Sequence, residues 1–577
     1  MNNEFKYNDG GEEKLREIFS TSEFEEDTTW RKYVNNWSIY YHLSPNRKNL
    51  LRWIDFDKES ISILELGAGC GAITSYLTSL KNKPKVVAVE GSSVRADLIR
   101  LRCNKADNLT VHTQTIQDYE DSEKYDFVSL IGVLEYSGVY VKGTSPFLNI
   151  LKKAVSFLKP EGVLLLAIEN QFGHKYFAGH NEDHYGIPFE GISDYPNYKG
   201  IRTFGKKELQ TMLKEVGLSK QYWTYPFPDY KMPNTILTDK SFNTASFDWL
   251  SLLNLPTTDS NSSNKLAFDE RAFLKKMSKN LDISYFMNSF LVCASKSDLN
   301  EIFQLQTLAN HLQFSHGNKF QNIKEFTQTN QNGIIVNQKK FHDGECISVD
   351  SVEYYSDYDN LLLLVVDNWK QKKYDIVAKY LLLWLDILRK FVLDSKSRDI
   401  CYNFEKFCFS HLEQKIYENE LEWLPAQNLD LILRNCLVND QKNDVKIIDQ
   451  EWNVGVDIPL KLVVDRGMYY LILKINQMVG LKDVVKKGCW NMPDALKNQL
   501  PELIYKPNLK STLRFDCWFQ KGVRNGSFTH KLYKVDLKKI KVNNSFHLKD
   551  KFFNFGKILL KKLGLKDIVK LIYLKFK

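Results

Sequence analysis

Residues 61–170 alternate between short apolar runs and amphipathic stretches. Five of the apolar runs predict strands, at residues 61–65, 85–90, 109–115, 125–131 and 163–169. Apolar residues at helical spacing between them predict helices at residues 72–80, 93–104 and 148–158. Strands that alternate with helices predict an α/β fold with a parallel sheet covered on both faces.

The flanking segments have different patterns. Residues 1–50 predict helical segments rich in Trp and Tyr, and residues 171–200 form a loop-like stretch crowded with His, Asp, Asn and Tyr. Residues 206–216 predict a helix, and the apolar run 286–295 predicts a strand that closes the sheet.

A second domain is predicted to start near residue 298. It begins with a helical piece, continues with a strand pair around residues 333–341, and then has helices within 374–393 and 460–478. The predicted boundaries are therefore 1–297 for the first domain, 298–480 for the second, and 481–577 for a C-terminal extension.

Composition supports a soluble globular chain. Hydrophobic residues make up 43% and charged residues 26% of the 577 residues, which excludes collagen-like and largely disordered proteins. Apolar runs are far shorter than the about 20 residues of a membrane span, and the N-terminus does not resemble a secretory signal. Nine cysteines without a C-x-x-C pair indicate reduced thiols in a cytoplasmic protein.

The positive charge is concentrated at the C-terminus. Residues 531–577 hold 14 Lys, no Arg and 3 Asp, a net charge of +11, whereas the whole chain carries +9. Within residues 551–577 the apolar side chains recur at helical spacing opposite lysines, which is typical of an amphipathic helix lying on a membrane surface. A helix that docks on a partner protein or on the protein's own body is the alternative. The lack of Arg and the continuous apolar face argue against nucleic acid as the partner.

The strongest motif follows the first predicted strand. Glu65 is followed by Gly67, Ala68, Gly69 and Gly71, at the turn into the first predicted helix. Dinucleotide sites favour G-x-G-x-x-G, whereas the spacing here is G-x-G-x-G. An acid two positions before the first glycine would repel a pyrophosphate but can bind a cation. A dehydrogenase or another glycine turn of an α/β fold is the alternative.

Polar residues after the next two strands complete a ligand set. Glu90 ends the second strand, where a carboxylate can bind ribose hydroxyls, and Gln117 and Asp118 follow the third strand, where they can meet an adenine amine. S-adenosylmethionine has these groups and carries an ammonium and a sulfonium. The order of acid, glycines, ribose acid and adenine residue resembles that of class I S-adenosylmethionine-dependent methyltransferases, which implies a Rossmann-like fold.

The acceptor would bind near the loops after the fourth and fifth strands. The sequence at Gly132–Tyr136 lacks the N-P-P-Y motif of many nucleic-acid and protein amide methyltransferases. His180, Asp183 and His184 lie in the polar loop, and a His beside carboxylates can act as a general base. A sugar hydroxyl would need such a base, whereas a phosphate oxygen would need only positioning. The alternative for each of these residues is that it braces a long loop.

Longer motifs make the resemblance narrower. Residues 40–52 (YYHLSPNRKNLLR), 167–192 and 225–233 (YPFPDYKMP) are similar to those of bacterial methyltransferases encoded with O-antigen and capsule enzymes. That family includes bifunctional methyltransferase–kinases that terminate O-antigen chains. The resemblance implies a glycan or lipid-linked glycan acceptor, with Tyr40, Tyr41 and Arg47 in a lead segment over the cofactor.

A second motif resembles a kinase catalytic loop. Asp430 and Asn435 are five residues apart, and Asp449 ends a following apolar run. A base Asp followed by an Asn and a second Asp is the phosphoryl-transfer set of kinases, in which Asn435 and Asp449 would hold Mg²⁺. The pattern resembles kinases of the aminoglycoside-phosphotransferase type and implies an α+β domain that uses ATP.

The sequence departs from that kinase pattern in two respects. Asn428 stands where His is usual, two positions before the base. A Gly-rich phosphate loop is missing, and the candidate phosphate-binding lysine is Lys339 or Lys340. A kinase-like domain that only binds its ligand is therefore the alternative.

Together these features predict a cytoplasmic protein bound peripherally to the inner face of the cell membrane. It would methylate a surface polysaccharide or its lipid-linked precursor, and its second domain would phosphorylate the glycan end, which caps the chain. One alternative is direct sugar O-methylation with an inactive second domain. Another is an assembly module that recruits a glycosyltransferase. RNA methylation is a third.

Overall fold

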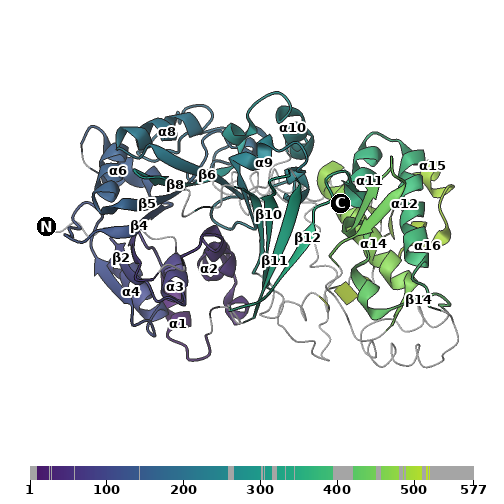
Figure 1. The fold of residues 1–577 in the computed structure, drawn as a ribbon, viewed down its shortest axis with the longest axis horizontal. Helices are drawn as coiled ribbons and strands as arrows, with labels where there is room; N and C mark the ends of the chain where they lie inside the picture. Colours follow the sequence, from purple (N-terminus) through teal and green to yellow (C-terminus); the bar gives the residue numbers. More distant parts are fainter. Residues whose placement is uncertain are drawn as a thin grey trace, which may run out of the picture.

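The computed structural model describes residues 10–519 with gaps (Figure 1). The gaps are residues 25, 27–28, 57–58, 142, 258–265, 300–302, 304–305, 315–320, 332, 343–344, 394–419, 450–456, 480–484, 487–488, 491, 510–511, 513–514 and 517–518. The basic C-terminal tail predicted from the sequence lies outside the described residues. Among the described helices, none is both long and apolar enough to cross a membrane.

The N-terminal half is built on a parallel sheet, as the alternating pattern predicts. Its strand order is β3-β2-β1-β4-β5, and all four neighbouring pairs are parallel. The strands are β1 (Ser62–Leu66), β2 (Lys85–Glu90), β3 (Leu109–Thr113), β4 (Tyr125–Ile131) and β5 (Leu158–Glu169). The order reverses at β1, so that β1 and β4 diverge into loops at the edge where such sheets bind ligands. The prediction of a Rossmann-like α/β fold is confirmed.

The sheet extends well beyond these five strands. Antiparallel strands continue it in the order β8-β6-β7-β9-β10-β11-β12. They are β6 (Lys220–Phe227), β7 (Thr235–Thr238), β8 (Ser289–Ser295), β9 (Thr307–Gln313), β10 (Gln321–Gln328), β11 (Ile334–His342) and β12 (Glu345–Glu353). The predicted helical piece after residue 298 is wrong, because β9 and β10 occupy it. Hydrogen bonds between β7 and β9 make the sheet continuous across residue 298, near which the sequence places a domain boundary. That boundary stays a prediction.

Helices cover both faces of the parallel sheet because successive strand residues point to opposite sides. Leu64 of β1 belongs to one core with residues of α6 (Pro146–Ser156) and α8 (Lys206–Glu215), whereas its neighbour Ile63 belongs to another core with residues of α3 (Ala72–Thr78). The helices of this half are α1 (Glu12–Phe19), α2 (Trp37–Leu43), α3 (Ala72–Thr78), α4 (Ser93–Arg102), α5 (Ser137–Tyr140), α6 (Pro146–Ser156), α7 (His174–Phe177), α8 (Lys206–Glu215), α9 (Asp239–Asn243) and α10 (Glu270–Met277). The alternation of apolar residues thus creates two cores, one on each face.

The C-terminal body is mainly helical and lies beside the antiparallel end of the sheet (Figure 1). Its core surrounds Trp384, which is fully buried and donates a hydrogen bond to the carbonyl of Leu431 at 3.0 Å. Lys370 donates to Asp269 at 2.5 Å and Lys474 to the carbonyl of Leu255 at 2.7 Å, so polar contacts join this body to the N-terminal half.

The elements of this body are listed here with their bounds. The helices are α11 (Leu361–Lys370), α12 (Tyr374–Arg389), α14 (Leu460–Val479), α15 (Asp494–Lys497) and α16 (Glu502–Tyr505). The short strands are β13 (Asp359–Asn360), β14 (Trp423–Leu424), β15 (Cys436–Asn439), β16 (Asp444–Ile447), β17 (Ile458–Pro459), β18 (Val485–Lys486) and β19 (Cys489–Trp490).

Candidate functional site

A cavity of about 810 Å³ lies at the carboxyl ends of the parallel strands. It is lined by residues from the glycine loop (67–71), from the lead segment (residues 40–52, which include Tyr41 and Arg47) and from the polar loop (residues 171–200). Ten of the sixteen site residues predicted from the sequence line it: Tyr41, Arg47, Glu65, Gly67, Ala68, Gly69, Glu90, Gln117, Asp183 and His184. Gly71, Asp118 and His180 do not line it, and Asp430, Asn435 and Asp449 belong to the C-terminal body.

The three glycines of the loop after β1 all adopt positive φ angles, of 78°, 57° and 78° at Gly67, Gly69 and Gly71. A Cβ on Gly67 would lie 2.6 Å from the Cγ2 of Val133, so the loop could not approach the segment after β4 with any other residue. A Cβ on Gly69 would meet nothing within 4 Å. The G-x-G-x-G spacing therefore reflects a tight turn held against neighbouring loops.

Two buried carboxylates face the cavity from the ends of β1 and β2. Glu65 accepts a hydrogen bond from the Thr74 hydroxyl at 2.6 Å, and burial raises its pKa to about 7. Glu90 accepts backbone hydrogen bonds from Gly69 at 2.8 Å and Ser92 at 2.9 Å, and burial raises its pKa. One carboxylate for an ammonium and one for ribose hydroxyls fit S-adenosylmethionine, and the cavity has room for both its halves.

This arrangement predicts a pH-dependent affinity for S-adenosylmethionine. Below a pKa of about 7 the Glu65 carboxyl is neutral, and an ammonium is bound by the ionised form. The affinity should therefore rise with pH between about 5.5 and 7, by up to about tenfold per pH unit, and then level off. Calorimetric titrations at several pH values would measure this. Glu65→Gln should bind more weakly and without the slope, and a wild-type affinity independent of pH would contradict the assignment.

The lead segment closes one side of the cavity, where the resemblance places Tyr41 and Arg47. The Arg47 guanidinium lies 4.2 Å from the centre of the Tyr41 ring and donates to the carbonyl of Lys231 at 3.4 Å. Arg47 is buried although it is charged, and Glu65 is the carboxylate with which it interacts. The segment is thereby held against both the donor and the acceptor sides.

Gln117 and Asp118, adjacent in sequence, point in different directions. Gln117 lines the cavity and donates a hydrogen bond to the carbonyl of Tyr140 at 3.1 Å. Asp118 is exposed and accepts a hydrogen bond from the Thr115 hydroxyl at 2.7 Å. Of the two, Gln117 has the position to meet an adenine.

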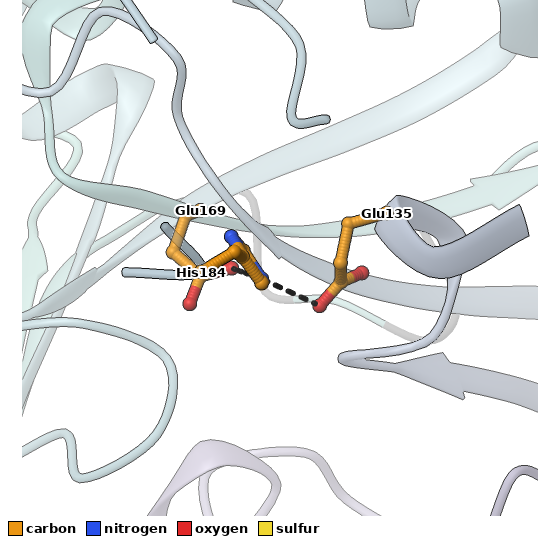
Figure 2. Close-up of side chains that lie close together, drawn as sticks. All are labelled: Glu135, Glu169 and His184. Atoms are coloured by element: carbon orange, nitrogen blue, oxygen red, sulfur yellow. Dashed lines mark ion pairs between the residues drawn. The ribbon is translucent and has the colours of Figure 1, made fainter. Parts of the chain in front are cut away.

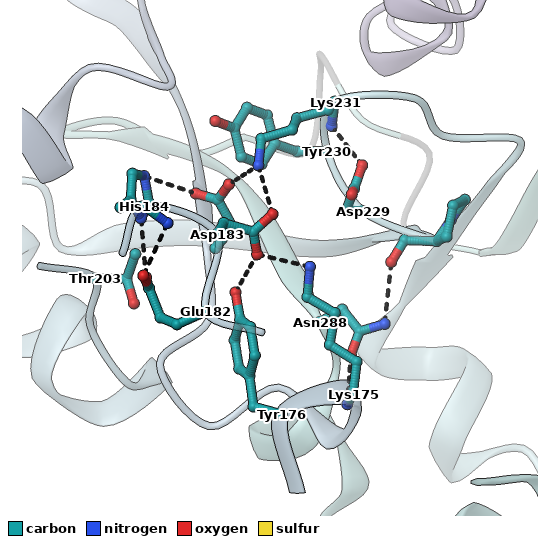
Figure 3. A network of polar contacts seen from close by, with 12 residues as sticks. Lys175, Tyr176, Glu182, Asp183, His184, Thr203, Asp229, Tyr230, Lys231 and Asn288 are labelled. Atoms are coloured by element: carbon teal, nitrogen blue, oxygen red, sulfur yellow. Dashed lines mark hydrogen bonds and ion pairs between the residues drawn. The ribbon is translucent and has the colours of Figure 1, made fainter. Parts of the chain in front are cut away.

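Asp183 is the centre of a buried ion-pair network at the other end of the cavity (Figure 3). Lys175 and Lys231 each donate to it at 2.7 Å, and the Tyr176 hydroxyl donates to it as well. Burial alone would raise the pKa of Asp183, but the two lysines outweigh it and hold this pKa well below its usual range. Asp183 is thus a permanent anion that positions Lys231.

His184 is surrounded by three carboxylates (Figures 2 and 3). Its Nδ1 is 2.9 Å from Glu182, and its Nε2 is 3.9 Å from both Glu135 and Glu169. Burial would lower the pKa of His184, but the carboxylates outweigh this and raise it well above its usual range. A protonated ring cannot accept a proton, so this environment does not favour the general base expected from the sequence. His180 is buried outside the cavity lining.

Several residues that line the cavity at the Asp183 end were not identified as site residues from the sequence. Asp229, Tyr230 and Lys231 line the cavity, and Lys231 also pairs with Glu169. They lie in the quoted segment YPFPDYKMP after β6, a run of aromatic, Pro and charged residues after a strand that was itself not predicted. Identification of that strand would have placed them at the acceptor side.

The structure brings two residues of the predicted kinase motif together. Asp430 accepts a hydrogen bond from Asn435 at 2.8 Å, another from Arg434 at 3.1 Å and one from Arg466 at 2.6 Å. Asp430 is 1% exposed, so its oxygens are directed at protein partners. Burial would raise its pKa, but the two arginines outweigh it and lower this pKa.

Asp449 pairs with Lys324 of β10, so the antiparallel strands and the helical body meet at this residue. Lys339 and Lys340, the lysines considered from the sequence, pair instead with Glu325 at 3.5 Å and Asp350 at 2.9 Å. Lys324 was not singled out because only the register of β10 reveals which lysine faces Asp449.

Comparisons with known proteins agree with the geometry of the cavity. Residues 39–222 match the model of a family described as a methyltransferase domain. This part of the chain is a methyltransferase domain. The match spans the glycine loop, Glu90 and the polar loop, and the prediction of a class I S-adenosylmethionine-dependent methyltransferase domain is confirmed.

Two curated proteins are similar to this domain. One is (S)-coclaurine N-methyltransferase of Papaver somniferum, 27% identical over 143 residues, which are 24% of this chain and 36% of that protein. The other is malonyl-[acyl-carrier protein] O-methyltransferase of Bacillus cereus, 29% identical over 148 residues, which are 26% of this chain and 49% of that protein. The chain therefore spans less than half the length of these relatives.

Among solved structures, part of the chain matches magnesium protoporphyrin IX methyltransferase from Synechocystis PCC 6803 with bound SAH. The identity is 11% and the TM-score 0.28, over 50% of this chain and 95% of that one.

Proposed function

We propose that the protein transfers a methyl group from S-adenosylmethionine to a bacterial surface polysaccharide or its lipid-linked precursor. The observation that carries this proposal is a single cavity with two different ends. Glu65, Glu90 and the glycine loop form a donor end, and Asp183, His184 and Lys231 form a polar end. A methyl donor and a hydrophilic acceptor can therefore meet in one enclosed space.

The chemistry of the polar end supports a hydrophilic acceptor. Lys231 is a cation held by Asp183 and Glu169, and the Tyr230 hydroxyl lies 3.4 Å from Glu135. Buried charged groups with fixed partners recognise hydroxyl and phosphate oxygens and would exclude an apolar acceptor. A glycan presents such oxygens.

The segments that resemble the surface-glycan methyltransferases support the class of glycan. Residues 40–52, 167–192 and 225–233 lie far apart in the sequence, yet each contributes residues to the wall of this cavity. The motifs that carry the resemblance therefore meet at the candidate site.

Within this proposal, a phosphate oxygen is favoured over a sugar hydroxyl as the methyl acceptor. A hydroxyl must lose a proton to a base, but Asp183 is ion-paired with two lysines, and both ring nitrogens of His184 are directed at carboxylates rather than at an acceptor. A phosphate oxygen is already anionic and would need only to be positioned, which Lys231 can do.

Phosphorylation of the glycan end by the C-terminal body is a second candidate function, with ATP and Mg²⁺. The ion pair between Lys324 and Asp449 favours it, because a strand lysine beside a metal-binding Asp is a recurring part of kinase sites. Asp430 and Asn435 would complete the set. The alternative is a body that only binds the glycan, or one that recruits a glycosyltransferase.

One assay separates these possibilities. Methyl transfer from labelled S-adenosylmethionine to purified lipid-linked glycan is measured with and without Mg-ATP. We expect incorporation only with Mg-ATP, because phosphate must be added before it is methylated. Incorporation without ATP would indicate direct sugar methylation, and none in either case would contradict the glycan acceptor.

A variant of Asp449 tests whether the C-terminal body supplies the ATP-dependent step. Asp449→Asn should abolish the ATP-dependent incorporation and leave transfer to a chemically phosphorylated glycan intact. Lys340→Met is the matched control, because Lys340 lies on the neighbouring strand and pairs with Asp350 on the surface. It should retain both activities.

A further inference from the structure

Three groups that can bind a metal ion converge behind the polar end of the cavity (Figure 2). Glu135 follows β4, Glu169 ends β5, and His184 lies in the loop after α7. Each offers one ligand atom, and these atoms all lie within 4.8 Å of one another. All three side chains are at most 4% exposed.

The two distances from His184 suit a shared ion better than direct hydrogen bonds. His184 Nε2 is 3.9 Å from an oxygen of Glu135 and 3.9 Å from an oxygen of Glu169. A hydrogen bond would require at most about 3.2 Å. Two ligands of one metal ion, each bound at about 2.0–2.2 Å, can be up to about 4.4 Å apart.

His184 is also oriented as metal-binding imidazoles are. Its Nδ1 is held by Glu182 at 2.9 Å, which fixes the ring so that Nε2 faces Glu135 and Glu169. Proteins commonly hold a metal-binding His by a carboxylate on its other nitrogen, because this contact fixes the ring and raises its basicity.

The two glutamates keep oxygens that protein groups do not satisfy. Lys231 pairs with one oxygen of Glu169, but the other oxygen, which is directed at His184, has no hydrogen-bond partner. In Glu135 the oxygen that faces His184 lies 3.4 Å from the Tyr230 hydroxyl, and the other oxygen lacks a hydrogen-bond partner. Buried carboxylate oxygens without partners are costly, and a cation between them would offset that cost.

We propose that Glu135, Glu169 and His184 bind one divalent cation, of the kind that accepts mixed oxygen and nitrogen ligands, such as Mn²⁺ or Zn²⁺, and that the ion displaces the proton from His184 Nε2. His184 lines the cavity, so the ion would sit at its acceptor end. Three protein ligands leave coordination positions for water or an acceptor oxygen. The site goes beyond methyl transfer and can be tested without knowledge of the acceptor.

The test is a titration of the full-length, tag-free protein with Mn²⁺ after treatment with a chelator. Electron paramagnetic resonance reports the free Mn²⁺ that remains. We expect one ion per chain, with affinity at least tenfold weaker in Glu135→Gln and in Glu169→Gln. Glu270→Gln is the matched control, because Glu270 is also a buried carboxylate beside a histidine, 3.4 Å from His174. This variant should bind Mn²⁺ with the affinity of the wild type.

Two further measurements, of thermal unfolding and of S-adenosylmethionine binding, complete this test. Mn²⁺ should raise the thermal unfolding temperature of the wild type and of Glu270→Gln, and should raise it less in Glu135→Asp. Glu135→Asp keeps the negative charge, so it can be tested even if Glu135→Gln and Glu169→Gln fail to fold. S-adenosylmethionine binding is measured on the same samples. Wild type that binds S-adenosylmethionine but no Mn²⁺ would overturn the metal site alone, as would unchanged Mn²⁺ affinity in both amide variants. Mn²⁺ binding without methyl transfer to the glycan would leave the site standing and overturn the proposed function.

Discussion

Replacement of Glu90 by alanine should weaken the affinity for S-adenosylmethionine by about 100-fold or more. Glu90 ends β2 and lines the cavity, and its two oxygens fix the backbone amides of Gly69 and Ser92. A hydrogen bond to a charged group contributes about 1.5–3 kcal/mol, and the variant loses both the contacts that shape the glycine loop and those available to the ribose. Two such contacts correspond to about 100-fold or more in affinity.

Isothermal titration calorimetry with S-adenosylmethionine would measure this loss. Asp118→Ala is the informative companion, because Asp118 belongs to the same sequence-predicted ligand set but is exposed and bonded to Thr115. Its affinity should stay within about twofold of wild type. Normal binding by Glu90→Ala in a folded protein would contradict the donor site as described.

Replacement of Arg466 by alanine should destabilise the C-terminal body by about 3–5 kcal/mol, the range for breaking a buried ion pair. Arg466 is fully buried and donates to Asp430 at 2.6 Å, to Asp516 at 3.1 Å and to the carbonyl of Leu429 at 3.0 Å. Without it, two carboxylates would remain in the interior with part of their charge uncompensated. Urea denaturation followed by tryptophan fluorescence would measure the free energy of unfolding.

Arg434→Ala is the control for this prediction. Arg434 contacts the same Asp430 at 3.1 Å, but its side chain is 44% exposed, so its loss should cost no more than about 1 kcal/mol. Equal effects of the two substitutions would contradict the distinction between a buried and a solvent-screened pair. The arginines lower the pKa of Asp430, so the stability from this pair is present at neutral pH and is lost as the pH falls through that pKa.

The donor half of the site was predictable because its signals are local. Glu65 and the three glycines lie within seven residues, and the glycine spacing directly reflects a backbone turn with positive φ angles. Glu90 was predictable because the carboxyl ends of neighbouring parallel strands meet at one edge of a sheet. The apolar runs around them are long and regular enough to indicate strand or helix on their own.

The acceptor half was predictable only as a region. The polar loop was recognised from its composition, but the state of each group was not. His184 has the usual features of a general base in the sequence, yet Glu135, 49 positions earlier, and Glu169 surround it and raise its pKa. Lys231 comes from the loop between β6 and β7 and makes Asp183 a paired anion. Charge in a buried site depends on neighbours that sequence spacing does not reveal.

The sequence by itself determined the α/β architecture, the glycine turn and the donor carboxylates, because hydrophobic periodicity and backbone preference act between residues close in the chain. Only the tertiary structure decided that the sheet continues from β7 into β9, that Lys324 rather than Lys339 faces Asp449, and that Glu135, Glu169 and His184 converge. The physical reason is common to all three. Strand register and the paths of loops depend on the packing of the whole chain, and they set which charges share a buried space.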